Sequence, residues 1–247
     1  MSVEERSVSQ FDADVVEQGG YLYADPERFS CRVANQRITQ AMFRFARPAG
    51  RRVIDIGCGD GTYTQELLAG GAAEVLAVDA AAEAISYAAE RCGEFSNARF
   101  EAVDIYELEV PGDPFDVAIV RCMLHHLYDA PAAIARVCSV AREVVVCEPN
   151  GYNPILKVIE KVSPYHVAHE EKSYSPSLLD RWFEQAGGEV LEREYIGLVP
   201  MFSPDPLARF CKAIEPVVEK TPLLRMLGCA QYVQRVRTPL ANAATEE

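Results

Sequence analysis

The sequence predicts an α/β fold in which a mostly parallel, seven-stranded sheet carries helices on both faces. Three observations indicate it. Strand-like and helix-like segments alternate from residue 50 to 150, the predicted strands are short apolar runs, and acidic residues stand where several of them end. Such alternation produces parallel strands joined by crossover helices. Ligands of these sheets bind beyond the carboxyl ends of the strands, near the switch in strand order.

Residues 48–149 form the predicted core of the fold. The Ala-rich composition of 81–92 is typical of a good helix former, and 143–147 is wholly apolar except for its first residue. We expect strands at 52–56, 74–78, 98–103, 115–120 and 143–147, with helices at 62–69, 81–92 and 130–141.

Two further segments flank this core within the same domain. Residues 1–47 form an N-terminal helical cap segment, because apolar positions recur at helical spacing from residue 26 and Pro48 ends the pattern. Residues 150–247 complete the domain. They contain two predicted lid insertions, at about 150–175 and 200–228, and the last two strands, at 189–198 and 230–236. We expect the tail from Thr238 to be frayed.

Composition and net charge limit which binding partners and which cellular compartment we expect for the chain. A net charge of −13 disfavours nucleic acid, because an acidic surface repels phosphate backbones. The polar first residues do not resemble a signal peptide, and no apolar run approaches the roughly 18 residues of a membrane span. We therefore expect a cytoplasmic chain without stable membrane insertion. The eight cysteines are predicted to be reduced core residues, no metal site is predicted, and the oligomeric state stays open.

A glycine-rich turn after the first predicted strand is the most informative motif. Asp55 stands near the end of the strand, Gly57, Gly59 and Gly61 follow at every second position, and Thr62 opens a helix. Glycine suits a sharp turn that a ligand approaches closely, and the helix N-terminus offers unpaired N–H groups. The dinucleotide fingerprint would have a glycine where this chain has Thr62. A tight turn without a ligand is the simpler alternative.

Acids also end the second and third predicted strands. Asp79 follows Gly57 by 22 residues, a position from which a carboxylate accepts ribose hydroxyls in dinucleotide folds. Asp104 ends the third strand and precedes Ile105. Each acid taken singly has the alternative of capping a helix, and Asp129 is interpreted as a cap only.

Together these residues resemble the class I S-adenosylmethionine-dependent methyltransferases, in their small-molecule branch. The resemblance is strong over residues 50–150 and weaker over 169–187. It implies a Rossmann-like sheet with an antiparallel last strand and a helical cap, S-adenosylmethionine as cofactor and a small-molecule acceptor. It also implies that Asp104 receives the adenine amino group, that Ile105 packs on the ring, and that 121–129 lines the methionine part. The implied cofactor-binding residues are Asp55, Gly57, Cys58, Gly59, Gly61, Asp79, Ala80, Asp104, Ile105, Arg121 and Cys122.

His125 and His126, just beyond the fourth strand, are the best-placed candidate catalytic bases. Methyl transfer needs a nucleophile aligned with the methyl carbon, and an unactivated hydroxyl or amine also needs a base. Because adjacent residues on an irregular turn point apart, we expect one histidine to face the pocket and the other to pack. An acceptor that is already nucleophilic would need neither.

The candidate substrate-binding residues are Tyr21, Tyr23, His125, Asn150, Tyr165 and His166. The run with Tyr165 and His166 is predicted to start a lid and not to bind a metal. Apolar residues of the second insertion favour an apolar or lipid-like acceptor, with packing on the sheet as the alternative. They are Met201, Phe202, Leu207, Phe210, Ile214, Val217, Leu223, Leu224 and Leu227.

The sequence thus predicts an enzyme that transfers a methyl group from S-adenosylmethionine to O, N or C of a small molecule, with an apolar acceptor favoured. Two alternatives stay open. One is a nicotinamide-dependent oxidoreductase on a related fold, which the missing sixth-position glycine and the Asp104 site disfavour. The other is a non-catalytic domain that keeps the cofactor pocket to regulate a partner.

Overall fold

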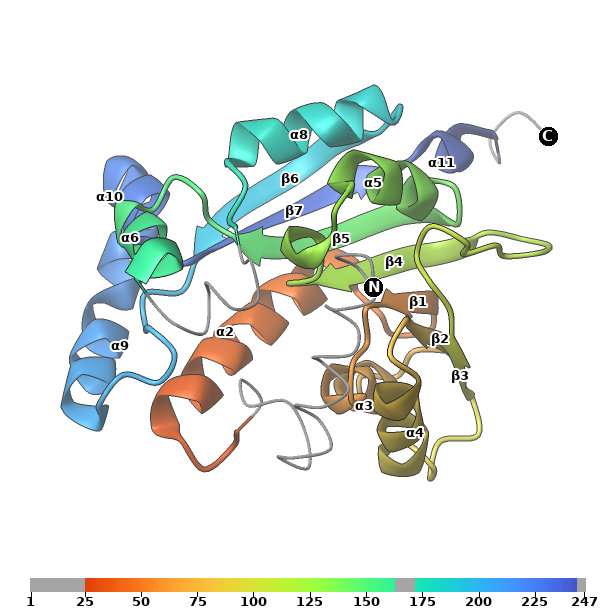
Figure 1. Ribbon diagram of the computed structural model, residues 1–247, viewed down its shortest axis with the longest axis horizontal. Helices are drawn as coiled ribbons and strands as arrows, with labels where there is room; N and C mark the ends of the chain where they lie inside the picture. The colour runs from red at the N-terminus through yellow and green to blue at the C-terminus, as the bar shows by residue number, and fades with distance from the viewer. Residues whose placement is uncertain (1–24, 163–171, 244–247) are drawn as a thin grey trace.

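The computed structural model describes residues 25–162 and 172–243, and these residues contain one seven-stranded sheet (Figure 1). Its spatial order is β3-β2-β1-β4-β5-β7-β6, and only β7 runs antiparallel to its neighbours. The predicted fold class is confirmed. The strands are β1 (Arg52–Ile56), β2 (Glu74–Asp79), β3 (Ala98–Ala102), β4 (Phe115–Arg121), β5 (Ala141–Pro149), β6 (Glu189–Ile196) and β7 (Gln231–Arg237).

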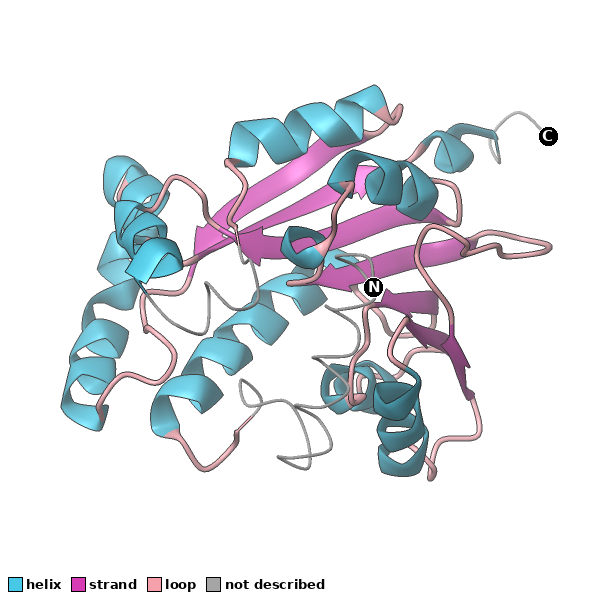
Figure 2. Cartoon of the chain, in the orientation of Figure 1, coloured by secondary structure: helices cyan, strands magenta, loops and turns pink. Residues whose placement is uncertain are grey.

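Helices cover both faces of the sheet (Figure 2). Helices α2, α3 and α4 pack on one face, and α5 and α8 pack on the other. The helices are α2 (Phe29–Ala46), α3 (Thr62–Ala69), α4 (Ala82–Arg91), α5 (Ala130–Cys138), α6 (Pro154–Val162), α8 (Pro176–Gln185), α9 (Asp205–Lys220), α10 (Pro222–Gly228) and α11 (Pro239–Ala243), with a short 3₁₀ helix, η2 (Leu124–His126).

Alternate residues of the central strands supply two cores. Ile54 and Ile56 belong to the core beneath α5 and α8, whereas Val53 belongs to the core beneath α2 and α3. Successive side chains of a strand point to opposite faces, so a sheet covered on both sides needs nearly continuous apolar strands. This requirement explains runs such as 144–147, which is buried throughout.

The strand order places the switch point at β1. Its neighbours are β2 on one side and β4 on the other, so the chain leaves β1 in one direction and later returns to its other side. Connections that depart in opposite directions open a crevice at the carboxyl ends of the two strands. The glycine turn after β1 and the histidine segment after β4 therefore lie at the same edge of the sheet.

The expectation of a frayed tail from Thr238 is wrong for the described part of the tail. Thr238 is buried, and its hydroxyl donates to the carbonyl oxygen of Ala141 at 2.6 Å. Helix α11 follows and packs against β5. The tail therefore closes the amino end of β5, where the strand begins.

The apolar residues of the second predicted insertion are the larger correction. From the sequence they favour an apolar acceptor, with packing on the sheet as the alternative. Most of them are exposed on α9 and α10, which contradicts packing on the sheet, and the apolar acceptor stays a prediction. Met201 and Phe202, in the loop before α9, are half-buried. Among the described helices, none combines the length and the apolar content that crossing a membrane requires. The exposed members are Leu207, Phe210, Ile214, Val217, Leu223, Leu224 and Leu227.

Candidate active site

The turn between β1 and α3 depends on its three glycines. All three adopt positive φ, at 74°, 55° and 76° for Gly57, Gly59 and Gly61. A Cβ on Gly57 would lie 2.5 Å from the Cγ of Met123, and one on Gly61 would lie 2.8 Å from the Cα of Ala88. The turn thus packs directly against the segment after β4, which brings the two predicted halves of the site into contact.

Asp79, at the end of β2, is held by two backbone N–H groups. One carboxylate oxygen accepts from Gly59 and the other from Ala81, each at 2.9 Å. The first bond ties the carboxylate to the glycine turn, and the second satisfies a donor at the start of α4. The carboxylate is thus fixed beside the glycine turn, at the carboxyl edge of the sheet.

Asp104 and Ile105 lie two and three residues beyond the end of β3. The Asp104 carboxylate accepts the N–H of Tyr106 at 2.9 Å, and Ile105 is buried in the core beneath α5 and α8. The backbone N–H of Val103 donates to the carbonyl oxygen of Asp79, so the loops that carry the two acids are adjacent.

Asp55 is buried in β1, where the hydroxyl of Thr64 donates to it at 2.6 Å. Burial raises the pKa of the Asp55 carboxyl to about 6, against the opposing effects of the Thr64 hydrogen bond and of the Arg121 charge. The carboxyl therefore changes its charge near neutral pH. A cationic ligand nearby would favour its ionised form.

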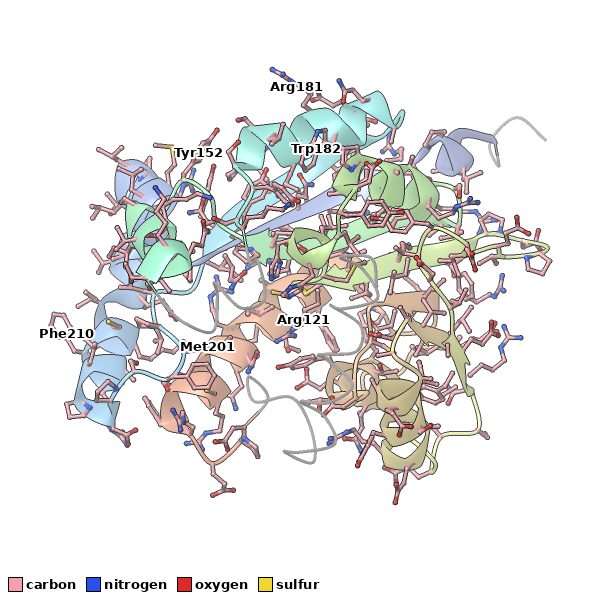
Figure 3. The ribbon with its side chains drawn as sticks, in the orientation of Figure 1. Arg121, Tyr152, Arg181, Trp182, Met201 and Phe210 are labelled. Atoms are coloured by element: carbon pink, nitrogen blue, oxygen red, sulfur yellow. The ribbon has the colours of Figure 1, made fainter. Side chains whose placement is uncertain are left out.

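Arg121, at the end of β4, is directed to α2 (Figure 3). It donates to the hydroxyl of Thr39 at 2.8 Å and to the side-chain oxygen of Asn35 at 3.0 Å, and its guanidinium lies 3.4 Å from the centre of the Tyr63 ring. Arg121, Tyr63 and Asp55 line the same small pocket. These contacts fasten the N-terminal helix to the sheet, and the cofactor role of Arg121 stays a prediction.

The remaining predicted cofactor residues lie around the same edge. Cys58 is buried in the turn, and Ala80 is exposed directly after Asp79. Cys122 adopts a positive φ of 51°, and its N–H donates to the carbonyl oxygen of Cys147 in β5 at 2.7 Å. That bond continues the β4–β5 pairing one residue beyond β4 and so sets the direction of the histidine segment.

His125 forms a buried pair with Glu148, which sequence analysis did not single out. The Nδ1 atom of His125 lies 2.7 Å from one carboxylate oxygen of Glu148, and the other oxygen accepts the N–H groups of Met123 and Leu124 at 2.9 and 2.8 Å. Both side chains are almost fully buried. Glu148 therefore fixes both the N-terminus of η2 and the orientation of the imidazole.

The signal for Glu148 was available in the sequence. Glu148 follows the apolar run of the fifth strand, as Asp79 and Asp104 follow the second and third. The expectation that acids at the ends of parallel strands form the site, applied to the fifth strand, would have identified Glu148. Its partner could not have been named, because the pairing depends on the register of β4 against β5.

The other predicted residues fall into three groups. The ring of His126 is half-buried and lies 4.0 Å from the ring of His125, tilted by 43°, so the expectation that the two side chains point apart is wrong. Asn150 is buried, and its amide donates to the carbonyl oxygens of Met226 and Cys229, so the structure places it in the connection between α10 and β7. Its substrate role stays a prediction. Outside the described residues lie Tyr21, Tyr23, Tyr165 and His166.

A glycine turn, acids at the neighbouring strand ends and a buried histidine–glutamate pair after the fourth strand together match an S-adenosylmethionine-dependent methyltransferase domain. Known proteins agree. The chain belongs to the methyltransferase domain family, whose match spans residues 47–187. This membership confirms the predicted class I methyltransferase family and S-adenosylmethionine as its cofactor, and it favours methyl transfer over the nicotinamide alternative.

Two curated relatives are similar to part of the chain. The ubiquinone biosynthesis O-methyltransferase of Neisseria meningitidis serogroup C (strain 053442) is 28% identical over 157 residues, which cover 58% of this chain and 66% of that protein. Phosphoethanolamine N-methyltransferase 3 of Arabidopsis thaliana is 27% identical over 161 residues, covering 59% of this chain and 33% of the relative. The chain therefore spans just under two thirds of the first relative and a third of the second.

A solved structure shares the fold over nearly the whole chain. The N-methyltransferase NodS from Bradyrhizobium japonicum WM9, in complex with S-adenosyl-L-homocysteine, superposes with a TM-score of 0.64 at 15% identity. The match covers 94% of this chain and 98% of that one. At this identity the likeness shows the fold alone.

Proposed function

We propose that this chain transfers the methyl group of S-adenosylmethionine to a hydroxyl oxygen of a small molecule, with His125 as the general base. The observation that carries the proposal is the buried His125–Glu148 pair, at 2.7 Å, two residues beyond Met123, which packs against the glycine turn. A base is needed for an unactivated hydroxyl, and a carboxylate behind the imidazole is the arrangement that prepares one.

The residues at the edge of the sheet suit the cofactor. The positive φ of Gly59 lets backbone approach a ligand closely, and the two acids match a nucleoside, Asp79 for its ribose hydroxyls and Asp104 for its adenine amino group. When bound, S-adenosylmethionine supplies an electrophilic methyl group on a sulfonium. Asp55 is buried in β1 two residues before Gly57, and a positively charged ligand at the turn would favour its ionised form.

The tautomer of His125 follows from its partner. An ionised Glu148 only accepts hydrogen bonds, so the Nδ1 atom of His125 carries the proton and donates it. The Nε2 atom is then the acceptor for the hydroxyl proton as the oxygen–carbon bond forms and the carbon–sulfur bond breaks. The resulting imidazolium is stabilised by the buried carboxylate beside it.

The His125–Glu148 pair also indicates which atom of the acceptor is methylated. An alcohol or phenol must lose its proton to become a strong nucleophile, whereas a neutral amine already has a lone pair. One relative is named an O-methyltransferase and another an N-methyltransferase, so names alone do not decide between oxygen and nitrogen. A dedicated base favours oxygen.

A matched pair of acceptors tests the proposal. The purified chain is incubated with S-adenosylmethionine and with either a phenol that carries an apolar side chain or the aniline of the same scaffold. We expect release of S-adenosylhomocysteine and a methylated phenol, and much slower reaction of the aniline. Faster methylation of the aniline would contradict the base. Cofactor binding without turnover on any hydroxyl acceptor would support the non-catalytic alternative instead.

A further inference from the structure

Helix α9 is amphipathic, but its apolar face is exposed and its polar face is turned toward the protein. Its apolar side chains Leu207, Phe210, Ile214 and Val217, at spacings of three and four, form one stripe that is exposed. Phe210 and Val217 are 62% and 64% exposed, and Figure 3 shows Phe210 at the outer edge of the helix. Soluble helices normally turn such a stripe inward.

The opposite face of α9 carries carboxylates that point into the protein. Glu215 accepts the N–H of Leu198 at 3.0 Å, and Glu219 accepts the N–H of Gly197 at 2.9 Å and pairs with Arg37. The two acids thus satisfy donors of the loop after β6. Since these bonds fix which face of the helix is inward, the outward position of the apolar stripe is a consequence of specific anchoring.

Two further helices at the same end of the molecule also carry exposed apolar side chains. Exposed Ile155, Val158 and Val162 repeat the spacing of three and four on α6. Helix α10 packs against α9, and the amide of Asn153 donates to the carbonyl oxygens of Gly228 and Cys229 at the end of α10. Figure 1 shows α6, α9 and α10 gathered at one end of the molecule. The outer apolar surface, as we call it, consists of Ile155, Val158, Val162, Leu207, Phe210, Ile214, Val217, Leu223, Leu224 and Leu227.

The charges around the outer apolar surface are basic, although the whole chain carries −13. The three helices contain six lysines and arginines and four acids. Three of the acids have largely buried side chains, Glu160, Glu215 and Glu219, which leaves Asp205 as the exposed one. The exposed basic residues are Lys161, Arg209, Lys220 and Arg225.

We infer that the outer apolar surface docks the protein on an anionic lipid bilayer. Apolar side chains with lysines and arginines at their margin are the composition of interfacial helices, which insert their apolar face among the headgroups while the basic residues meet anionic lipid. The three helices supply both parts. The surface lies on helices outside the candidate active site, so the inference holds whichever acceptor the enzyme uses.

The charge distribution favours a bilayer over a second copy of the chain. A symmetric pair would press the same surface of both copies together, which brings the four exposed basic residues of one copy near those of the other. Like charges at an interface oppose association, whereas an anionic lipid surface neutralises them. The net negative charge of the rest of the chain keeps the other faces away from the bilayer.

Vesicle sedimentation tests the inference without cofactor or substrate. The full chain is mixed with vesicles of phosphatidylcholine and phosphatidylglycerol in equal parts, or of phosphatidylcholine alone. We expect sedimentation with the anionic vesicles only, weakened by salt. Phe210→Asp with Val217→Asp should lower the bound fraction at least tenfold. Ala89→Asp, at an exposed position of α4, is the matched control and should bind as the wild type does.

Two outcomes would overturn the inference. Equal binding by the double variant and the wild type would exclude the outer apolar surface as the docking site. A wild type that ignores anionic vesicles but is dimeric in solution, with a monomeric double variant, would show that a second copy covers the surface. Circular dichroism of the double variant checks that it is folded, and methylation of a soluble phenol stays at the wild-type level if only docking is lost.

Discussion

The two halves of the sheet's carboxyl edge hold their polar side chains in different ways. In the half that contains β2 and β3, Asp79 and Asp104 are half-buried and each accepts the N–H two residues further along its own loop. In the half that contains β4 and β5, His125 and Glu148 come from different strands, bond to each other and are buried. The acids of the first half are thus half-buried and each has a local bond, although Asp79 also accepts from Gly59, whereas the second half holds a buried pair from two strands.

This difference corresponds to two tasks. A carboxylate held by neighbouring N–H groups is positioned before the ligand arrives, which suits reversible binding. A buried hydrogen-bonded pair has one geometry and excludes water, which suits proton transfer at a fixed place. The comparison predicts that changes in the first half alter affinity for the cofactor and that changes in the second half alter the rate of the reaction.

The largest effect is expected from Glu148→Gln, which keeps the shape of the side chain. Its oxygen can still accept from Met123 and Leu124, but its amide donates to Nδ1 of His125 and moves the imidazole proton to Nε2. Because the base then has no free lone pair at Nε2, kcat should fall about 100-fold or more. Steady-state kinetics measures kcat, and calorimetry should find the Kd for S-adenosylhomocysteine within about twofold of the wild type.

Glu143→Gln is the matched control for this change, because Glu143 lies on β5 near its other end and pairs with Arg51 and Arg235. It should leave kcat unchanged. The pH profile separates a positioning role from a structural one: without the carboxylate the imidazolium is less stable, so the acidic limb of kcat/KM should move to lower pH. An unchanged kcat in Glu148→Gln would remove the His125–Glu148 pair from the mechanism.

The sheet was predictable because its signals are local. Apolar runs, the glycine turn and the acids at strand ends each occupy a few adjacent residues, and the observed strands lie within two residues of the predicted ones. The cap of α5 was local as well. Asp129 accepts the N–H of Ala132, as interpreted from sequence.

The long-range contacts were not predictable. Arg121 bonds to Asn35 of α2, which is more than eighty residues away in the sequence. The apolar periodicity of α2 indicates that the helix has a buried face, but not where on the sheet the helix lies. The orientation of α9 failed for a related reason. Helical spacing shows that a helix has an apolar stripe, but backbone donors at Gly197 and Leu198 decide that its carboxylates turn inward.

The next largest effect is a pH dependence of stability that Asp55 contributes. Its pKa is raised from 3.8 to about 6 in the folded state, so folding favours the neutral carboxyl. The wild type should lose stability as the pH rises through this window, by about 3 kcal/mol in total, and Asp55→Asn should not. Denaturant unfolding between pH 4 and about pH 8 measures both curves. Parallel curves would show that Asp55 does not titrate there, and Asp113→Asn, at an exposed position, should follow the wild type.

A smaller effect, on the cofactor side, is expected from Asp79→Asn. The amide oxygen can accept from Gly59 or Ala81, so the turn keeps its shape, but the negative charge toward the ribose hydroxyls is lost. Affinity for S-adenosylhomocysteine should fall by about 1 to 3 kcal/mol, which calorimetry measures directly. Glu83→Gln, exposed on α4 nearby, should bind normally. Unchanged affinity in Asp79→Asn would refute the ribose role.

The smallest effect is expected at Asp129, and it tests whether this acid only caps a helix or also binds the cofactor. Asp129 ends the histidine segment, and its carboxylate accepts the N–H of Ala132 at 3.0 Å, which caps α5. Asp129→Ala should lower the free energy of unfolding by about 1 kcal/mol, and Asp129→Asn should lose less, because asparagine also caps helices. Neither variant should change the Kd for S-adenosylhomocysteine. If Asp129→Ala weakened cofactor binding as Asp79→Asn does, the affinity half of the edge would extend past β4, and the division of tasks between the two halves would fail.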